Sequence, residues 1–88
     1  MATMVVRHRV GDFGVWIHGH GERAEVIGQH SSSFKTFQDV HEPNSIVLVI
    51  ETDEPGELAA MLDDPVFADL KTSHTVIDPI IVSAEVDV

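Results

Sequence analysis

Histidine is the main candidate for a catalytic residue in this sequence, which contains six His among 88 residues and no Cys. The pKa of a free imidazole is about 6.5, so a histidine takes up or gives away a proton near neutral pH. Without cysteine, disulfides, thiolate zinc sites and thiol nucleophiles are excluded. The residue types therefore favour proton transfer by histidine.

His8 is the first candidate for a catalytic residue. It alternates with Met4, Val6 and Val10 in a segment rich in β-branched residues, so it shares the apolar face of a predicted strand. On that face it would act as a general acid or base at the floor of a cleft. The alternative is a histidine of the core or of a barrel interior that is bonded to a backbone carbonyl.

His20 and Trp16 form the second candidate. They share one inward stripe of the predicted helix that follows the strand, and together they would present a titrating group and an aromatic wall to a flat ligand. Phe34, on the next strand, is expected to wall the same site. Ordinary packing of Trp16 and of a half-buried His20 is the alternative. We therefore predict His8 and His20 as catalytic residues, and Trp16 and Phe34 as ligand-binding residues.

The pair His18 and His20 suggests a metal site, but helix geometry argues against it. Side chains two positions apart on a helix point about 200° apart, so they cannot chelate one ion. A larger set with His30, His41 or His74 would need contacts that the sequence does not establish. We expect no metal and no cofactor, and the sequence has no phosphate-binding glycine loop and no serine-hydrolase motif.

Composition disfavours several kinds of partner. Asp and Glu outnumber Lys and Arg by 15 to 5, which gives a net charge of −10 with neutral His. Nucleic acids and anionic membrane surfaces are disfavoured because both attract clusters of Lys and Arg. The longest apolar run, residues 46–50, is too short to span a membrane, and the N-terminus lacks the pattern of a signal peptide. The cytoplasm is the expected location.

The elements that must position these residues follow one another closely in a single domain over residues 1–88. Periodicity and turn residues predict strands over 3–10, 29–39, 45–52 and 75–86, a helix over 12–27, and a second helical region from 53 or 54 onward that Pro65 breaks or kinks. Asp12 is expected to cap the first helix and Gly28 to end it. Gly14, Gly19 and Gly21 weaken this helix, so either packing holds it in place or its middle is irregular. The second helical region is predicted to bury one face, which holds Leu58, Leu62, Val66 and Leu70.

The order β-α-β-β-α-β predicts an α+β domain of the ferredoxin-like class, with a four-stranded antiparallel sheet and both helices on one face. A solvated second face should alternate apolar and polar residues along each strand. Residues 46–50 and 80–82 are apolar throughout instead. Because soluble monomers seldom expose a large apolar patch, we predict a homodimer through the open sheet face.

Several short stretches follow a pattern that a known group of proteins shares. They are His8-Arg9-Val10-Gly11-Asp12-Phe13 with Trp16, Glu22-Arg23 with Gly28, Glu42-Pro43-Asn44, Glu51-Thr52-Asp53, and Asp64-Pro65 with Leu70. Through them the chain resembles the dimeric α+β barrel superfamily, which includes antibiotic-biosynthesis monooxygenases and small polyketide-cyclase-like proteins. The resemblance implies a dimer whose two sheets form a barrel, and a cleft between each sheet and its helices.

The resemblance also implies a function for that cleft. A cofactor-free enzyme of this kind would oxygenate or cyclise a small aromatic or polyketide-like molecule there, with His8 moving the proton and His20 assisting. Family membership alone does not establish catalysis, because one fold hosts many functions. The alternative is a non-catalytic dimer with a ligand-binding or structural role.

Overall fold

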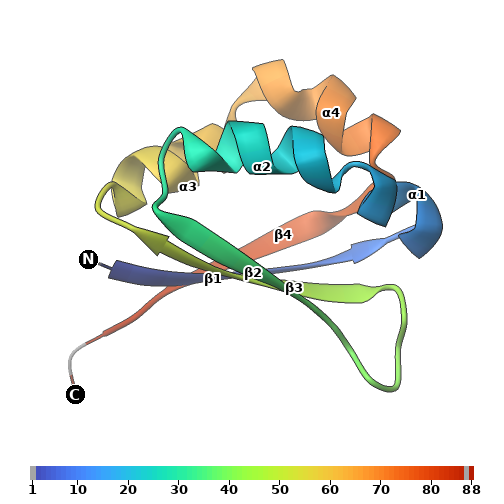
Figure 1. Ribbon diagram of the computed structural model, residues 1–88, viewed down its shortest axis with the longest axis horizontal. Helices are drawn as coiled ribbons and strands as arrows, with labels where there is room; N and C mark the ends of the chain where they lie inside the picture. The colour runs from blue at the N-terminus through green and yellow to red at the C-terminus, as the bar shows by residue number, and fades with distance from the viewer. Residues whose placement is uncertain (1, 87) are drawn as a thin grey trace.

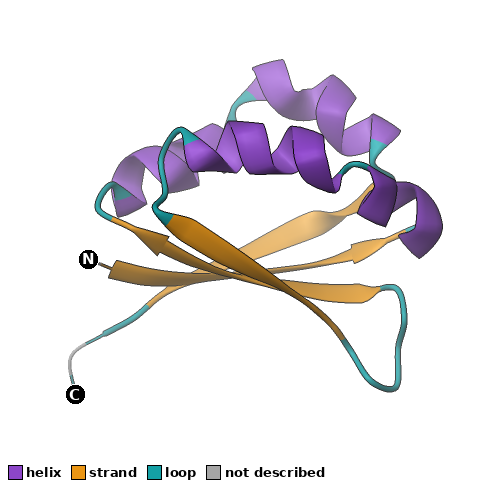
Figure 2. Ribbon diagram, in the orientation of Figure 1, coloured by secondary structure: helices purple, strands orange, loops and turns teal. Residues whose placement is uncertain are grey.

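Four strands form one antiparallel sheet, and all the helices lie on one face of it (Figures 1 and 2). The computed structural model describes residues 2–86 and 88. The elements are β1 (Ala2–Val10), α1 (Phe13–His18), α2 (His20–Gly28), β2 (Ser33–Gln38), β3 (Ser45–Thr52), α3 (Pro55–Asp63), the short 3-10 helix η1 (Pro65–Phe67), α4 (Ala68–Ser73) and β4 (Val76–Ala84). The strand order is β2-β3-β1-β4. The predicted ferredoxin-like α+β fold is confirmed.

The helix predicted over 12–27 is interrupted in its middle, which is one of the two alternatives that its glycines left open. Asp12 caps α1 as expected, because its side chain accepts a hydrogen bond from the backbone N–H of Val15 at 3.2 Å. The helix then breaks at Gly19, between α1 and α2. A Cβ atom at Gly19 would lie 2.5 Å from Cε1 of His74. The break therefore occurs where a histidine from the far end of the chain occupies the space of a missing side chain.

The second strand starts later than predicted, at Ser33 instead of residue 29. The residues before it prolong α2 as a helical turn, since the backbone N–H of His30 donates to the carbonyl of Ile27 at 3.1 Å. The hairpin that follows has the predicted turn. The side chain of Asp39 accepts hydrogen bonds from the backbone N–H groups of the turn, among them that of Glu42 at 2.7 Å.

The second helical region breaks at Pro65, as predicted. The side chain of Asp64 accepts a hydrogen bond from the backbone N–H of Val66 at 2.9 Å and so caps η1. The predicted buried face is wrong at one position, because Val66 is 73% exposed whereas Leu58 is fully buried. The break resets the helical register, so a spacing of four residues no longer keeps side chains on one face. None of the described helices is long and apolar enough to cross a membrane.

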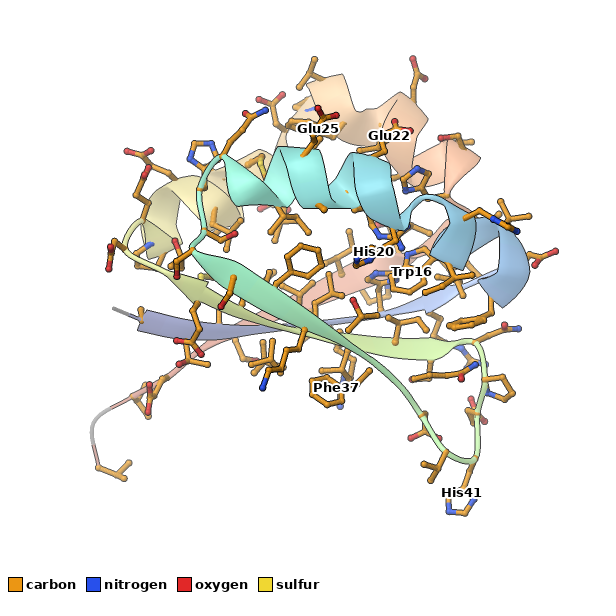
Figure 3. The ribbon with its side chains drawn as sticks, viewed as in Figure 1. Trp16, His20, Glu22, Glu25, Phe37 and His41 are labelled. Atoms are coloured by element: carbon orange, nitrogen blue, oxygen red, sulfur yellow. The ribbon has the colours of Figure 1, made fainter. Side chains whose placement is uncertain are left out.

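The residues of β3 point alternately to the two faces of the sheet. Ile46, Leu48 and Ile50 are buried beneath the helices, and Val47 and Val49 lie half-buried on the opposite face. The other strands add exposed apolar side chains to that opposite face, which are Val5, Phe37, Ile77 and Ile81. Figure 3 shows Phe37 projecting away from the helices. The apolar side chains that motivated the homodimer prediction therefore lie on the open sheet face, together with the charged Arg7 and Lys35.

Candidate functional site

A cavity of about 70 Å³ lies between the sheet and the helices, where the sequence predicted a cleft. Side chains from β1, β3 and β4 form its floor, and side chains from the four α-helices and η1 form its roof. Most of this wall is apolar. Within the described wall, the titratable residues are His8, Arg23, Lys71 and His74, and none of them is an acid.

His8 lies on the helix-facing side of β1 and lines this cavity. It is 7% exposed, and its ring contacts that of Trp16 edge-on, with 5.9 Å between the ring centres. Its Nδ1 lies 3.0 Å from the carbonyl oxygen of Arg9. Since a carbonyl only accepts hydrogen bonds, we assign the proton to Nδ1 and the free lone pair to Nε2. Nε2 of His8 is therefore a basic nitrogen that forms no hydrogen bond with the backbone of β1.

Burial sets the protonation state of His8. Loss of solvent lowers the pKa of His8 below its ordinary value of 6.5, and this effect outweighs the hydrogen bond to Arg9, which raises the pKa. His8 is consequently neutral at pH 7. A neutral buried imidazole with a free lone pair is suited to act as a general base.

The pairing of β1 with β4 is irregular at His8. Arg7 pairs with Ile81 and Arg9 pairs with Ile77, so three residues of β4 face His8 alone. Such bulges bend a strand, and they are frequent next to active sites. A second hollow opens here on the other side of the sheet, and His8 is the one described residue that borders both this hollow and the cavity.

Protonation of His8 is expected to weaken the fold in acid. Its pKa is lower in the folded chain than the ordinary value of 6.5, so the unfolded chain binds the proton more readily. The stability that depends on neutral His8 is complete above pH 6.5 and is lost as the pH falls through the folded pKa. Urea unfolding at pH 7.5 and pH 5.5 should show a larger loss of stability for the wild type than for His8→Gln. Equal losses in the two proteins would contradict this expectation.

Arg23 is a charged residue of the cavity wall that the sequence prediction did not include. It is 7% exposed, and its guanidinium carbon lies 3.7 Å from the centre of the Trp16 ring. Burial lowers the pKa of Arg23 to about 10, so the side chain remains positively charged at pH 7. The sequence does contain a signal for its position within α2, because Arg23 stands four residues before the buried Ile27 and so shares its face of the helix.

One terminal nitrogen of Arg23 holds the side chain in place. Nη1 donates to the backbone carbonyl of Trp16 and to Nδ1 of His74, the latter at 3.1 Å. His74 therefore carries its proton on Nε2, which lies 3.7 Å from a carboxylate oxygen of Glu22. Glu22 is exposed, and Figure 3 shows it on the side of α2 away from the sheet.

Three other N–H groups at this place are buried and have no hydrogen-bond partner among residues 2–86 and 88. They are Nε and Nη2 of Arg23 and Nε1 of Trp16. Buried donors are hydrogen-bonded in the great majority of cases, and an unsatisfied donor costs about 1–3 kcal/mol. The cavity wall thus holds a positive charge and several donors without an acceptor.

The structure divides the four predicted site residues into two pairs. His8 and Trp16 line the cavity, whereas His20 and Phe34 are not part of its described wall. The ring of His20 is exposed and lies 5.6 Å from that of Phe34, measured between ring centres. The prediction that His20 shares a buried stripe with Trp16 is therefore wrong. The interruption at Gly19 separates the two helices and ends the common stripe.

A group of possible metal ligands lies elsewhere, at the N-terminus of α3. His30, Glu54 and Glu57 bring their ligand atoms within 4.8 Å of one another. Nδ1 of His30 is 3.3 Å from Glu54 and 3.7 Å from Glu57. Interaction between the two carboxyl groups lowers the pKa of Glu54 and raises that of Glu57. Carboxylates at a helix N-terminus also stabilise the helix through their attraction to the positive end of its dipole. This surface cluster therefore has a structural explanation without an ion.

Comparison with known proteins identifies solved structures of the same fold. No protein-family model matches the chain, and no curated protein matches it significantly in sequence. A crystal structure described as an antibiotic biosynthesis monooxygenase superposes with a TM-score of 0.71 at 15% identity and covers 100% of this chain and 99% of that chain. SnoaB, a cofactor-independent oxygenase from Streptomyces nogalater, gives a TM-score of 0.71 at 14% identity and covers 98% of this chain and 91% of that chain.

Protein Atu4242 from Agrobacterium tumefaciens gives a TM-score of 0.70 at 17% identity, covering 100% of this chain and 94% of that chain. Identities this low show a common fold, and they do not carry over an activity. The chain thus has the ferredoxin-like α+β fold of the antibiotic biosynthesis monooxygenases, which is the resemblance that its sequence predicted.

Proposed function

We propose that the protein binds a small aromatic or polyketide-like molecule in the cavity and acts on it as a cofactor-free monooxygenase or cyclase. The observation that carries this proposal is His8, a buried neutral histidine in the wall of an apolar cavity, next to the ring of Trp16. The likeness to SnoaB, described as a cofactor-independent oxygenase, supports the choice of reaction.

In this proposal Nε2 of His8 removes a proton from an acidic C–H or O–H group of the substrate. In an oxygenation, the electron-rich anion reacts with dioxygen, and a CH₂ group becomes C=O. One oxygen atom enters the product and the other leaves as water, so dioxygen is the oxidant. In a cyclisation, the same anion attacks a carbonyl carbon within the substrate. Trp16 forms an aromatic wall beside the reacting atoms.

The size of the cavity narrows the choice of substrate. A volume of about 70 Å³ is smaller than the roughly 150 Å³ of an engineered cavity that takes up benzene. The cavity therefore does not enclose a polycyclic molecule, and it encloses a single ring only if flexible side chains such as Met61 and Lys71 move. His20 and Phe34 lie outside the cavity, so we assign them no contact with a ligand held inside it.

Dioxygen uptake tests the catalytic part of the proposal. We expect consumption of dioxygen with one member of a panel of single-ring phenols, hydroquinones and β-dicarbonyl compounds. With ¹⁸O₂, mass spectrometry should find one labelled oxygen atom in the product. A cyclisation would instead give a product without label whose mass equals that of the substrate, or that mass less water. Absence of any product across the panel would argue against catalysis.

The alternative is a dimer that binds a ligand without catalysis, and the small volume of the cavity favours it. Such a protein would shift its melting temperature with the same panel but would yield no product. We also propose the cytoplasm as its location, which fractionation of the source cells would test.

We propose further that the protein is a homodimer through the open sheet face. Sedimentation equilibrium should give about twice the 9.6 kDa mass of one chain. Phe37→Glu places a charge on this face, on the edge strand β2, and is expected to give the monomer. Val40→Glu is the matched control, since Val40 is 90% exposed in the hairpin turn and should leave the dimer intact. A wild-type species of one chain mass would contradict the dimer.

A further inference from the structure

The least expected feature of the cavity wall is a buried positive charge that no acidic side chain binds directly, since Glu22 acts on Arg23 only through its charge. Arg23 is 7% exposed, and its Nε and Nη2 groups find no acceptor within the described chain. Glu22 does not take up these donors, because its carboxylate is exposed and lies near Nε2 of His74. A buried, unpaired guanidinium is unfavourable for folding alone.

The geometry of the guanidinium shows which side of it is free. Nη1 is held by the carbonyl of Trp16 and by His74, and the Trp16 ring stacks against the guanidinium plane. The remaining N–H groups are those of Nε and Nη2, which form one edge of the group. This is the edge that binds the two oxygens of a carboxylate with two parallel hydrogen bonds.

We infer that the cavity recognises small apolar molecules that carry a carboxylate, which binds the Nε and Nη2 edge of Arg23. The residue stacked on Arg23, Trp16, also has an unpartnered buried donor, its Nε1–H. The apolar wall formed by residues such as Val6, Leu48 and Ile80 accommodates the body of the ligand. This inference deepens the proposed function and rests on its binding step, but it does not depend on catalysis.

The net charge of the whole chain disfavours the binding of small anions elsewhere on the protein surface. The net charge is −10, so the protein surface as a whole repels small anions. Lys71 is the other cation of the described wall, and its ammonium group is engaged with the backbone carbonyl of Leu62. Arg23 is thus the cation of the wall with unpaired donors, and because those nitrogen atoms are buried, a carboxylate reaches them only when side chains of the wall move.

Fluorescence titration tests the inference, because Trp16 is the single tryptophan of the chain and lines the cavity. The probes are benzoate and benzamide, which are similar in shape but differ in charge, and the smaller pair butyrate and butyramide. At pH 7 the wild type should bind the carboxylate of at least one pair about tenfold or more tightly than the amide. Arg23→Gln should weaken carboxylate binding about 10- to 100-fold and leave amide binding within about twofold.

Two further variants complete the test, and three outcomes would overturn the inference. Arg23→Lys keeps the positive charge but cannot form the two parallel hydrogen bonds to a carboxylate. It should therefore bind carboxylates more tightly than Arg23→Gln and more weakly than the wild type. Arg9→Gln is the matched control and should keep the full preference of the wild type, because Arg9 is exposed and lies outside the described cavity wall. Arg23→Lys decides the matter together with the wild type if Arg23→Gln does not fold. Equal binding of acid and amide to the wild type would overturn the inference alone. An equal loss of both probes in Arg23→Gln would also overturn it. Failure of all four probes to bind would overturn the proposed binding function as well.

Discussion

Replacement of His8 by Gln is expected to lower kcat by about 10²- to 10⁴-fold on any substrate that the wild type turns over. Gln keeps a side-chain donor for the carbonyl of Arg9 but has no basic nitrogen to take the substrate's proton. The loss should appear in kcat more than in KM, since His8 acts on the reacting atoms. Steady-state kinetics on the purified variant, with circular dichroism to show that it folds, measures the effect.

The matched control for this substitution is His20→Gln. His20 is the first residue of α2, and its ring is exposed and outside the described cavity wall. Its replacement should therefore change kcat by no more than about twofold. The acid limb of the pH profile should lie below pH 6.5, because burial lowers the pKa of His8 and only its neutral form is a base. Unchanged turnover in His8→Gln, or an equal loss in both variants, would contradict the role of His8.

Substitution of Gly19 by Ala is expected to lower the free energy of unfolding by about 1–3 kcal/mol. The new Cβ atom would lie 2.5 to 2.9 Å from three atoms of the His74 ring. That ring is buried and is tied to Nη1 of Arg23, so it cannot move away without disturbing the charged side of the cavity. Urea unfolding measures the stability, and the affinity for a carboxylate probe should fall in parallel.

Gly21→Ala is the control for this effect. Gly21 lies in α2, and a Cβ atom built there meets nothing within 4 Å. Alanine favours a helix over glycine by up to about 1 kcal/mol, so this variant should be at least as stable as the wild type. If Gly19→Ala proved as stable as Gly21→Ala, the contact between Gly19 and His74 would not explain the interrupted helix.

The sheet was predictable because its pattern is local. The bounds of β3 agree with prediction at both ends, since a run of β-branched and apolar residues is closed by turn residues on either side. The glycines of the first helical region predicted an irregular middle, but not the residue at which the helix breaks. The break at Gly19 coincides with a contact to His74, which follows two strands and three further helices after α2 in the chain. A tertiary contact here overrides the helical periodicity of residues 12–27.

The residues of the candidate site also divide into those that the local sequence predicted and one that it did not. His8 and Trp16 were found from sequence because each sits in a simple apolar pattern, and the structure places both at the cavity. Arg23 was missed because charged residues are seldom fully buried, and periodicity arguments leave them on the surface. Its burial depends on the Trp16 ring and on His74, which the linear sequence does not bring together.

The central claim is that the functional site is the cavity beneath the helices. Anomalous diffraction from crystals soaked with 4-bromobenzoate tests this claim most directly. We expect a bromine peak among the apolar side chains of the cavity, with the carboxylate within hydrogen-bond distance of Nε and Nη2 of Arg23. Bromine peaks confined to the open sheet face, or to the hollow on the other side of His8, would contradict this placement of the site.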